Sequence, residues 1–246
     1  MILKRNVDDR YSTILRRWEG STAILIGGGP SLTKAQIAMV SEAQIVKDYH
    51  VIAVNDAYLW APHADVLYAA DYRWWGWHAA GIAKPALGLT AGQVRERFEA
   101  FVGERCSIRH GDSVLHDELV HVLKNLTHPD HGDGLSRDQG AISTGRNSIF
   151  QALNIAVLAG VRRALLLGVD GKEAADGRTH FHGGHPAPTP YSLFFEAMRK
   201  SFAASEASIK ESGVEVLNCS PGSAIDAFPK VSLEEALNGV KHNLAA

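Results

Sequence analysis

The stretch from Ala23 to Leu32, which reads AILIGGGPSL, constrains the fold more than any other part of the sequence. Its first four residues predict a short buried strand, the glycines and the proline end that strand, and the amphipathic residues 32–43 predict a helix. Glycine lets a ligand approach the backbone closely, and a helix N-terminus offers N–H groups and the positive end of a dipole. The pattern is neither G-x-G-x-x-G nor a P-loop, so a turn without a ligand is the alternative. We expect a phosphate to bind at Gly27, Gly28, Gly29, Pro30 and Ser31.

Three further apolar runs also end in polar residues. Residues 51–54 are followed by Asn55 and Asp56, residues 66–70 by Asp71, and the run that begins at 164 by Asp170. Near-continuous apolar runs are typical of parallel strands that helices cover on both faces. Ligands of such sheets bind beyond the carboxyl ends of the strands. We therefore expect a Rossmann-like α/β fold with a mainly parallel sheet flanked by helices, and a nucleotide site that includes these four polar residues. For Asn55 and Asp170 the alternative is a turn cap.

A second anion site is predicted where the clearest helix begins. Residues 146–159 carry apolar side chains at helical spacing, and Gly160 follows as a C-terminal cap. Ser143, Thr144 and Gly145 come directly before this helix. A hydroxyl there can cap the helix, and the N–H groups of its first turn can bind an anion.

The segment from about 172 to 190 predicts a lid-like loop, because it is rich in glycine and proline and lies near the carboxyl edge of the sheet. It carries His180, His182 and His185. A histidine can take a proton from an acceptor hydroxyl or give one to a departing phosphate, and His182 and His185 are the candidates for this role. The alternatives are a zinc site shared with Asp170 and histidines that are simply solvated.

The rest of the chain is organised around these segments without an internal repeat or a charged linker, which favours a single domain over 1–246. Three tryptophans follow the third predicted strand, at Trp74, Trp75 and Trp77, where a core or subunit contact and a stacking platform for a sugar or base are both open. The remaining expectations are helices over 7–18, 91–101, 191–211 and 232–239, strands at 86–89, 106–109 and 214–218, and loops or a short helix between 110 and 140.

Composition excludes several functional classes. The formal net charge is −2, so nucleic acid and anionic membrane are not expected as the main partners. No apolar run approaches the ~20 residues of a membrane span, and no signal peptide begins the sequence. Cys106 and Cys219 stand in apolar contexts that suit reduced, buried cysteines. We expect a cytoplasmic protein that can form a homo-oligomer.

Several motifs together resemble a known group. The stretches ILIGGGPSL, VIAVNDAY, STGRNSIFQALNIAVLAGVRRALLLGVDG, GGH and GVEVLNCSPGSAI follow one another from residue 24 to residue 225. In order and spacing they resemble the bacterial family 42 sialyltransferases and the related proteins of unknown-function family 115. The latter include pterin pyrophosphokinases and flagellin-modifying motility accessory factors.

The resemblance implies roles for individual residues. In the sialyltransferases the equivalent glycine turn, strand-end Asn and Ser/Thr-Gly step hold the cytidine monophosphate part of the donor, and a loop histidine is the general base. These roles fall to the 27–31 turn, to Asn55, to Thr144 and Gly145, and to His185. The chain departs from the family pattern at Gly28, where the family has Asn, and at Ala141-Ile142, where it has Arg. Tyr191 is the nearest candidate for a tyrosine that binds the leaving phosphate.

Three functions follow as hypotheses. The first is transfer of a glycosyl group from a nucleotide-activated sugar, of the CMP–sialic acid type, to a hydroxyl of a glycan or small molecule, with no required cofactor. The second is diphosphate transfer from ATP with Mg²⁺ held by Asp56, Asp71 or Asp170. The third is a nucleotide- or glycan-binding protein without catalysis.

Overall fold

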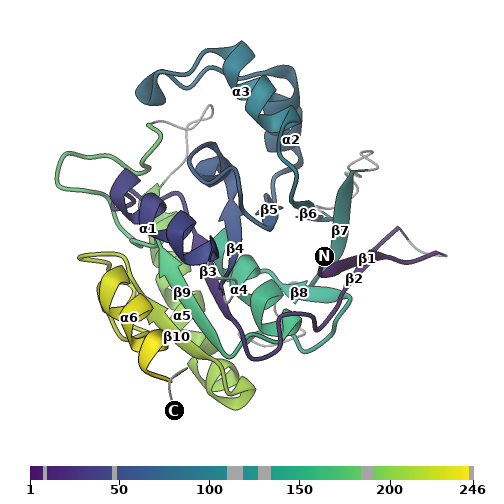
Figure 1. The fold of residues 1–246 in the computed structure, drawn as a ribbon, viewed down its shortest axis with the longest axis vertical. Coiled ribbons are helices and arrows are strands. Elements are labelled where there is room, and N and C mark those ends of the chain that lie inside the picture. The colour runs from purple at the N-terminus through teal and green to yellow at the C-terminus, as the bar shows by residue number, and fades with distance from the viewer. Residues whose placement is uncertain (8–9, 46–48, 110–118, 127–133, 184–190, 244–246) are drawn as a thin grey trace.

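Eight strands form one fully parallel sheet, in the order β10-β9-β3-β4-β5-β6-β7-β8 (Figure 1). The computed structural model describes residues 1–7, 10–45, 49–109, 119–126, 134–183 and 191–243. The predicted Rossmann-like α/β class is confirmed. The strands of this sheet are β3 (Thr22–Ile26), β4 (Tyr49–Val54), β5 (Val66–Tyr68), β6 (Glu104–Ile108), β7 (Val120–Leu126), β8 (Ala141–Ser143), β9 (Arg163–Leu167) and β10 (Glu215–Asn218).

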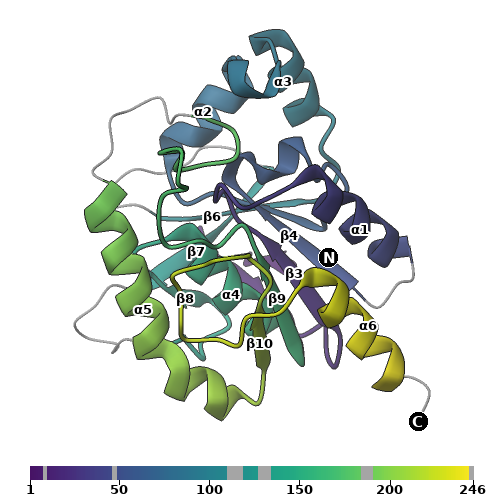
Figure 2. The same ribbon diagram turned by 90° about the vertical axis from the view of Figure 1, so that its left-hand side faces the viewer.

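Helices cover both faces of the sheet, which explains the runs of four apolar residues at the ends of the central strands β3, β4 and β9. All five residues of β3 are buried. One face packs against α4 (Ser148–Ala159) and α5 (Tyr191–Ser212). The other face packs against α1 (Lys34–Ile45), α2 (Tyr72–Ala80), α3 (Ala91–Glu99) and α6 (Leu233–Asn243). Figure 2 shows α5 on one side of the sheet and α1 and α6 on the other.

The strand order reverses between β3 and β9. From β3 the chain adds strands outward to β8, and it then returns through α4 to place β9 on the other side of β3. In parallel sheets such a reversal opens a crevice beyond the carboxyl ends of the two strands, because their connections leave in opposite directions. The glycine turn follows β3 and Asp170 follows β9, so the reversal brings the two together.

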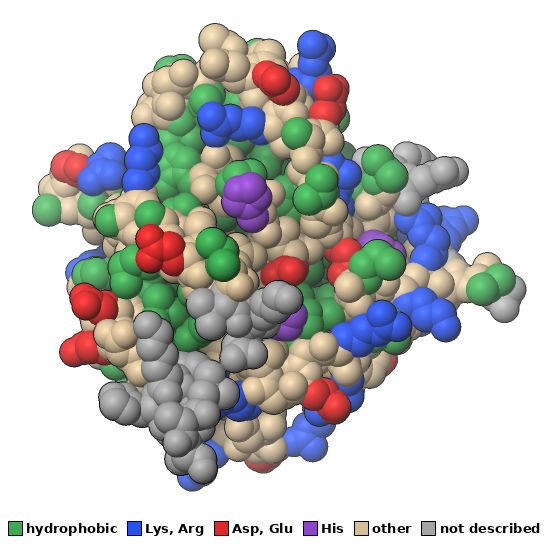
Figure 3. Space-filling model, viewed as in Figure 1, with side chains coloured by type: hydrophobic (Ala, Val, Ile, Leu, Met, Phe, Trp, Pro, Cys, Tyr) green, Lys and Arg blue, Asp and Glu red, His purple; other side chains and the backbone are tan. Residues whose placement is uncertain are grey.

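The prediction of a helix over 7–18 is wrong. The N-terminal segment forms an antiparallel pair of β1 (Leu3–Arg5) and β2 (Ser12–Ile14), with Leu3 opposite Ile14. Ser12 and Ile14 are buried and Thr13 between them is half-buried, which is a period of two rather than the helical 3.6. The hairpin also approaches β7, where the Arg5 guanidinium donates to the Val120 carbonyl at 3.2 Å. Figure 3 shows lysine and arginine side chains on the side of the molecule where Figure 1 places this hairpin.

The region between 81 and 143 also differs from expectation. Residues 86–89 do not form a strand; Pro85–Leu87 is a 3₁₀ turn, η2. The part of 110–140 that was expected to be loop or short helix contains β7, between β6 and β8 in the sheet. Its sequence VHVLKNL carries three polar residues, and only Val120 and Leu123 are buried. The remaining helices and strands lie within a few residues of their predicted ranges.

The tryptophans and cysteines are mainly core residues. Trp74 and Trp75 are buried and Trp77 is half-buried, which supports the core interpretation, although Trp74 also lines the cavity described below. Cys106 and Cys219 are buried and unoxidised, as expected. Burial raises the pKa of the Cys219 thiol to about 12. Among the described residues no helix is both long enough and apolar enough to cross a membrane.

Candidate functional site

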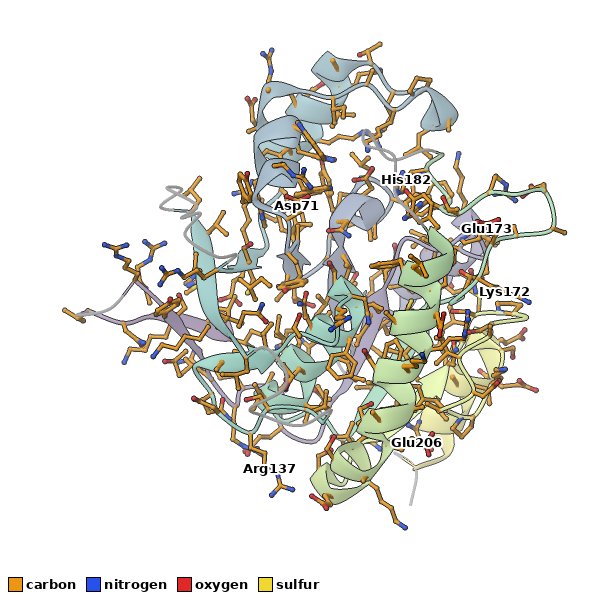
Figure 4. All side chains as sticks on the ribbon, turned by 180° about the vertical axis from the view of Figure 1, so that it is seen from behind. Asp71, Arg137, Lys172, Glu173, His182 and Glu206 are labelled. Carbon is orange, nitrogen blue, oxygen red and sulfur yellow. The ribbon has the colours of Figure 1, made fainter. Side chains whose placement is uncertain are left out.

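A cavity of about 560 Å³ opens at the carboxyl edge of the sheet, beyond the ends of β3, β4, β5 and β9. We call it the main cavity. Figure 4 labels Asp71 and His182 at this end of the sheet and Arg137 and Glu206 at the opposite end. The volume of the main cavity suits a small-molecule ligand of nucleotide size. Its lining includes Gly27, Gly28, Gly29, Asn55, Asp56, Asp71, Arg73, Trp74, Asn147, Ser148, Ile149, Asp170, His180, His182, Tyr191, Phe194, Phe195 and Met198.

The glycine turn is shaped by close packing against the end of β9. A Cβ atom on Gly27 would lie 2.6 Å from the Gly168 carbonyl oxygen, and one on Gly29 would lie 1.9 Å from Asp170 Oδ2. Neither glycine has a positive φ. Glycine is therefore required here because β9 approaches closely. At Gly28 a Cβ would lie 3.3 Å from His180 Cδ2. This position therefore lies against the loop from about 172 to 190 that carries His180 and His182, which we call the histidine loop.

The amide predicted to bind phosphate at the end of this turn is already bonded to a carboxylate. The Ser31 hydroxyl donates to Asp170 Oδ2 at 3.0 Å and the Ser31 amide does so at 3.4 Å. The first turn of α1 lies further on and carries its own cap, since the Gln36 amide donates to Thr33 Oγ1. Burial raises the pKa of Asp170, while the bonds from Ser31 oppose that rise. The Ser31 amide and hydroxyl are thus engaged by Asp170, whereas Gly27, Gly28 and Gly29 of the same turn line the main cavity.

Asn55 directly follows β4, Asp71 follows β5, and both residues line the main cavity. Asn55 adopts a φ of 52°, a left-handed conformation that costs energy for any residue except glycine and that clusters at functional sites. Asp71 caps α2 by accepting from the Arg73 amide at 2.9 Å. Its carboxylate also pairs with the Arg73 guanidinium, with Nη2 2.7 Å from Oδ2. Both residues therefore lie where the sequence predicted.

The second predicted anion site is displaced by a few residues. Ser143, Thr144 and Gly145 line a different cavity of about 570 Å³, the second cavity, between β8 and α5. The cap of α4 is Asn147, whose side chain accepts from the Phe150 amide at 2.8 Å. Asn147, Ser148 and Ile149 line the main cavity, so the α4 N-terminus faces it in place of the residues we expected.

The displacement has a local cause in the backbone. Gly145 and Arg146 have φ values of 47° and 54°, and the Asn147 amide bonds to the Thr144 carbonyl. This tight turn delays the start of α4 until after Asn147. Asn before Ser-Ile-Phe is a recognisable N-cap, and this signal could have located the helix start from the sequence.

Asp56 is the centre of a buried polar cluster. Its Oδ1 accepts from Trp74 Nε1 at 2.8 Å and lies 3.1 Å from His78 Nε2. Its Oδ2 pairs with Lys84 Nζ and lies 3.4 Å from His182 Nδ1. Burial alone would raise the pKa of Asp56, but the bond from His78 and the charges of His182, His78 and Lys84 hold that pKa well below its usual range. Asp56 is therefore a carboxylate whose partners are protein groups. We call Asp56, Trp74, His78, Lys84 and His182 the Asp56 cluster.

The histidine loop crosses the glycine turn and brings His182 to this cluster. The Phe181 amide donates to the Gly28 carbonyl at 3.1 Å, which anchors the loop. His180 and His182 both line the main cavity, with ring centroids 4.8 Å apart. His185 lies outside the described residues, as do the last residues of the expected lid.

The first two turns of α5 form an aromatic wall of the main cavity, of which only Tyr191 was expected at the site. Phe194, Phe195 and Met198 line the main cavity together with Tyr191. Tyr191 stacks with Phe195 at a centroid distance of 6.0 Å. Its hydroxyl oxygen is buried and has no hydrogen-bond partner among the described residues. The spacing of its apolar residues predicts a helix and gives no sign that the start of that helix faces a cavity.

Few cationic side chains line the main cavity in the described part of the chain. Arg73 is the only lysine or arginine in the described part of its lining, and Arg73 pairs with Asp71. Residues 184–190 of the histidine loop contain neither lysine nor arginine. Within the described ranges, no three His, Cys, Asp or Glu side chains are grouped so that they could hold a metal ion.

Comparisons with known proteins add little. No protein-family model matches the chain, and no curated protein matches it. Among solved structures, the "putative epimerase" of Bacteroides thetaiotaomicron matches over 92% of each chain at 14% identity, with a TM-score of 0.26. A likeness this weak carries no argument about the function of this chain.

Proposed function

We propose that the main cavity binds a nucleotide-activated sugar and that the protein transfers the glycosyl group to an acceptor hydroxyl. The observation that carries the proposal is His182, which lies in this cavity with Nδ1 3.4 Å from a buried carboxylate of Asp56. A histidine oriented by a carboxylate is a common arrangement for a general base. The cavity lies where the strand order reverses, the usual ligand site of such sheets.

The charge of the cavity favours a donor with a single phosphate, as in a CMP-linked sugar. In the part of its lining that the structure describes, the main cavity has one lysine or arginine side chain, Arg73, and three carboxylates. Asp56 is balanced by Lys84 and Asp71 by Arg73. A nucleoside diphosphate would bring more negative charge than these groups can offset without a cation. The single phosphodiester of a CMP-linked sugar carries one negative charge and can be held by the amides at the α4 N-terminus.

The proposed reaction assigns a task to each part of the site. The acceptor oxygen attacks the anomeric carbon of the donor, and the bond from that carbon to the phosphate oxygen breaks. The bonding electrons leave with the nucleotide phosphate, which Ser148 and Ile149 amides and the Tyr191 hydroxyl stabilise. The acceptor proton passes to Nε2 of His182 and then to solvent. The aromatic wall of α5 supplies an apolar surface for the base or the sugar ring.

A thermal-shift screen tests the ligand class. A ligand that binds only the native state raises its apparent stability by mass action. We expect CMP to raise the melting temperature without Mg²⁺, and UDP, GDP and ADP to do so less. A shift only with ATP and Mg²⁺ would replace this proposal with diphosphate transfer, and no shift with any nucleotide would contradict nucleotide binding.

A matched pair of variants then tests catalysis. His182→Gln should keep the CMP shift and lose about 10²- to 10⁴-fold in transfer or hydrolysis of the donor, which is the range of general-base catalysis. His63→Gln is the control, because His63 is exposed and outside the cavity lining. Equal turnover in His182→Gln and wild type would remove His182 from the mechanism.

A further inference from the structure

The Asp56 cluster contains buried groups that the proposed reaction does not use directly. His78 and Lys84 do not line the main cavity, yet both contact the carboxylate that faces His182. Side-chain exposure is 1% for His78 and 6% for Lys84. Burial of a lysine and a histidine is costly unless their protons are used in bonds. Their arrangement therefore has to be explained by what it does to Asp56.

The directions of the hydrogen bonds around Asp56 can be assigned by elimination. An ionised carboxylate only accepts, so every nitrogen facing it has to carry a hydrogen. Trp74 Nε1 and Lys84 Nζ always do. His78 faces Oδ1 with Nε2, and its Nδ1 lies 2.7 Å from the Tyr58 hydroxyl. His78 is neutral at pH 7, because burial lowers its pKa against the opposing pull of Asp56. The Tyr58 hydroxyl consequently donates to Nδ1, and His78 carries its hydrogen on Nε2.

The same rule gives the opposite result for His182. Its Nδ1 lies 3.4 Å from Oδ2 of Asp56, which is an ion-pair distance rather than a formed hydrogen bond, and the carboxylate favours a hydrogen on the nitrogen that faces it. A neutral imidazole has a single N–H, so Nε2 then keeps its lone pair. A Cβ placed on Gly28 would lie 3.8 Å from this Nε2, on the glycine-turn side of the cavity.

We propose that Asp56 is a positioning residue that fixes His182 as the Nδ1–H tautomer, and that Lys84 keeps Asp56 ionised inside the protein so that it can do so. The two histidines of the cluster are thereby held in opposite tautomers, His78 as Nε2–H and His182 as Nδ1–H. This inference explains how His182 becomes a base in the proposed function, and it rests on that function only for its catalytic consequence.

The experiment is nitrogen-15 NMR of the full chain labelled at histidine, which reports the tautomer of each imidazole and needs no substrate. The chain has 12 histidines, and spectra of His78→Gln and His182→Gln assign the two signals. At pH 7.5 we expect opposite tautomers, as assigned above. His182 with its hydrogen on Nε2 would overturn the inference, and it would do so whether or not any donor is turned over. The wild-type spectrum decides this point even where a variant does not fold.

Asp56→Asn gives the complementary test. An amide has an accepting oxygen and a donating nitrogen, so one side of residue 56 can no longer accept, and either His78 or His182 has to change tautomer. Asp176→Asn is the control, because Asp176 is an exposed partner of Arg178 in the same loop region. We expect Asp176→Asn to leave both tautomers as they are. Unchanged tautomers in Asp56→Asn would contradict the inference. Where transfer activity exists, the same variant should lower kcat by about 10²- to 10⁴-fold with little change in KM.

Discussion

Replacing Lys84 by methionine removes the cation that faces Asp56 and leaves a carboxylate in the protein interior. The two side chains are 6% and 3% exposed, so solvent screens the pair little. Removing one partner of a buried ion pair costs about 3–5 kcal/mol, because the remaining charge keeps its desolvation penalty. Asp56 still accepts from Trp74 and lies next to His78, which places the expected loss near the lower end, at about 3 kcal/mol.

Urea unfolding followed by tryptophan fluorescence measures this loss as a lower midpoint at unchanged m. Lys230→Met is the matched control, because Lys230 pairs with Asp226 at the surface and its loss should leave the midpoint where it is. The double variant Asp56→Asn/Lys84→Met removes both charges and should be more stable than Lys84→Met alone. A loss below about 1 kcal/mol in Lys84→Met would refute the claim that this pair is a buried, coupled charge pair.

Three further predictions concern the turn, the pH dependence and the helix cap. Gly29→Ala should lower stability by about 3 kcal/mol or prevent folding, because its Cβ would lie 2.6 Å from the backbone carbonyl oxygen of Gly168, in addition to 1.9 Å from Asp170 Oδ2. Gly76→Ala meets nothing within 4 Å and should raise the urea midpoint slightly. Because the pKa of His78 is lowered in the native protein, the unfolded chain takes up a proton below about pH 6.5 that the native protein does not bind. The free energy of unfolding should therefore fall as the pH drops from about 6.5 to about 5.5, and it should fall less in His78→Gln. Asn147→Ala should cost about 1 kcal/mol in the same urea assay and weaken binding of CMP in calorimetry, since Asn147 caps the helix that faces the cavity.

The parts of the fold that could be predicted are those where local pattern and tertiary environment agree. β3, β4 and β9 each end in a run of four apolar residues because the sheet is covered on both faces, and the sequence shows these runs directly. The polar residues after these strands meet at one edge because parallel strands end on the same side. Asn55, Asp71 and Asp170 therefore line the predicted site.

The failures have a common physical cause, which is contact between distant segments. The N-terminal hairpin owes its place to the sheet, since Ser12 Oγ lies 3.0 Å from His121 Nδ1 and the Ile2 amide donates to Glu104. Nothing local distinguishes this segment from a short amphipathic helix. Likewise, glycine at 29 is required by the backbone carbonyl of Gly168, which lies 139 residues further along the chain.

The polar cluster could not have been predicted for the same reason. The sequence predicts that Asp56 binds a ligand because it follows a strand, but its carboxylate instead contacts Lys84, His78 and His182. These three residues come from the segment before η2, from α2 and from the histidine loop. No spacing rule connects them, and only the fold shows that a carboxylate joins them. The start of α4 is different, because the capping signal of Asn147 was present in the sequence.

Calorimetric titration of the protein with CMP tests the central claim most directly. The account predicts saturable binding of one CMP per chain that is lost in Ser148→Trp, where the new ring fills the main cavity at the α4 N-terminus. Ala197→Trp places the same ring in the second cavity and should leave binding intact. No binding of CMP to the wild-type protein, or binding that Ala197→Trp removes and Ser148→Trp does not, would contradict the assignment of the main cavity as the nucleotide site.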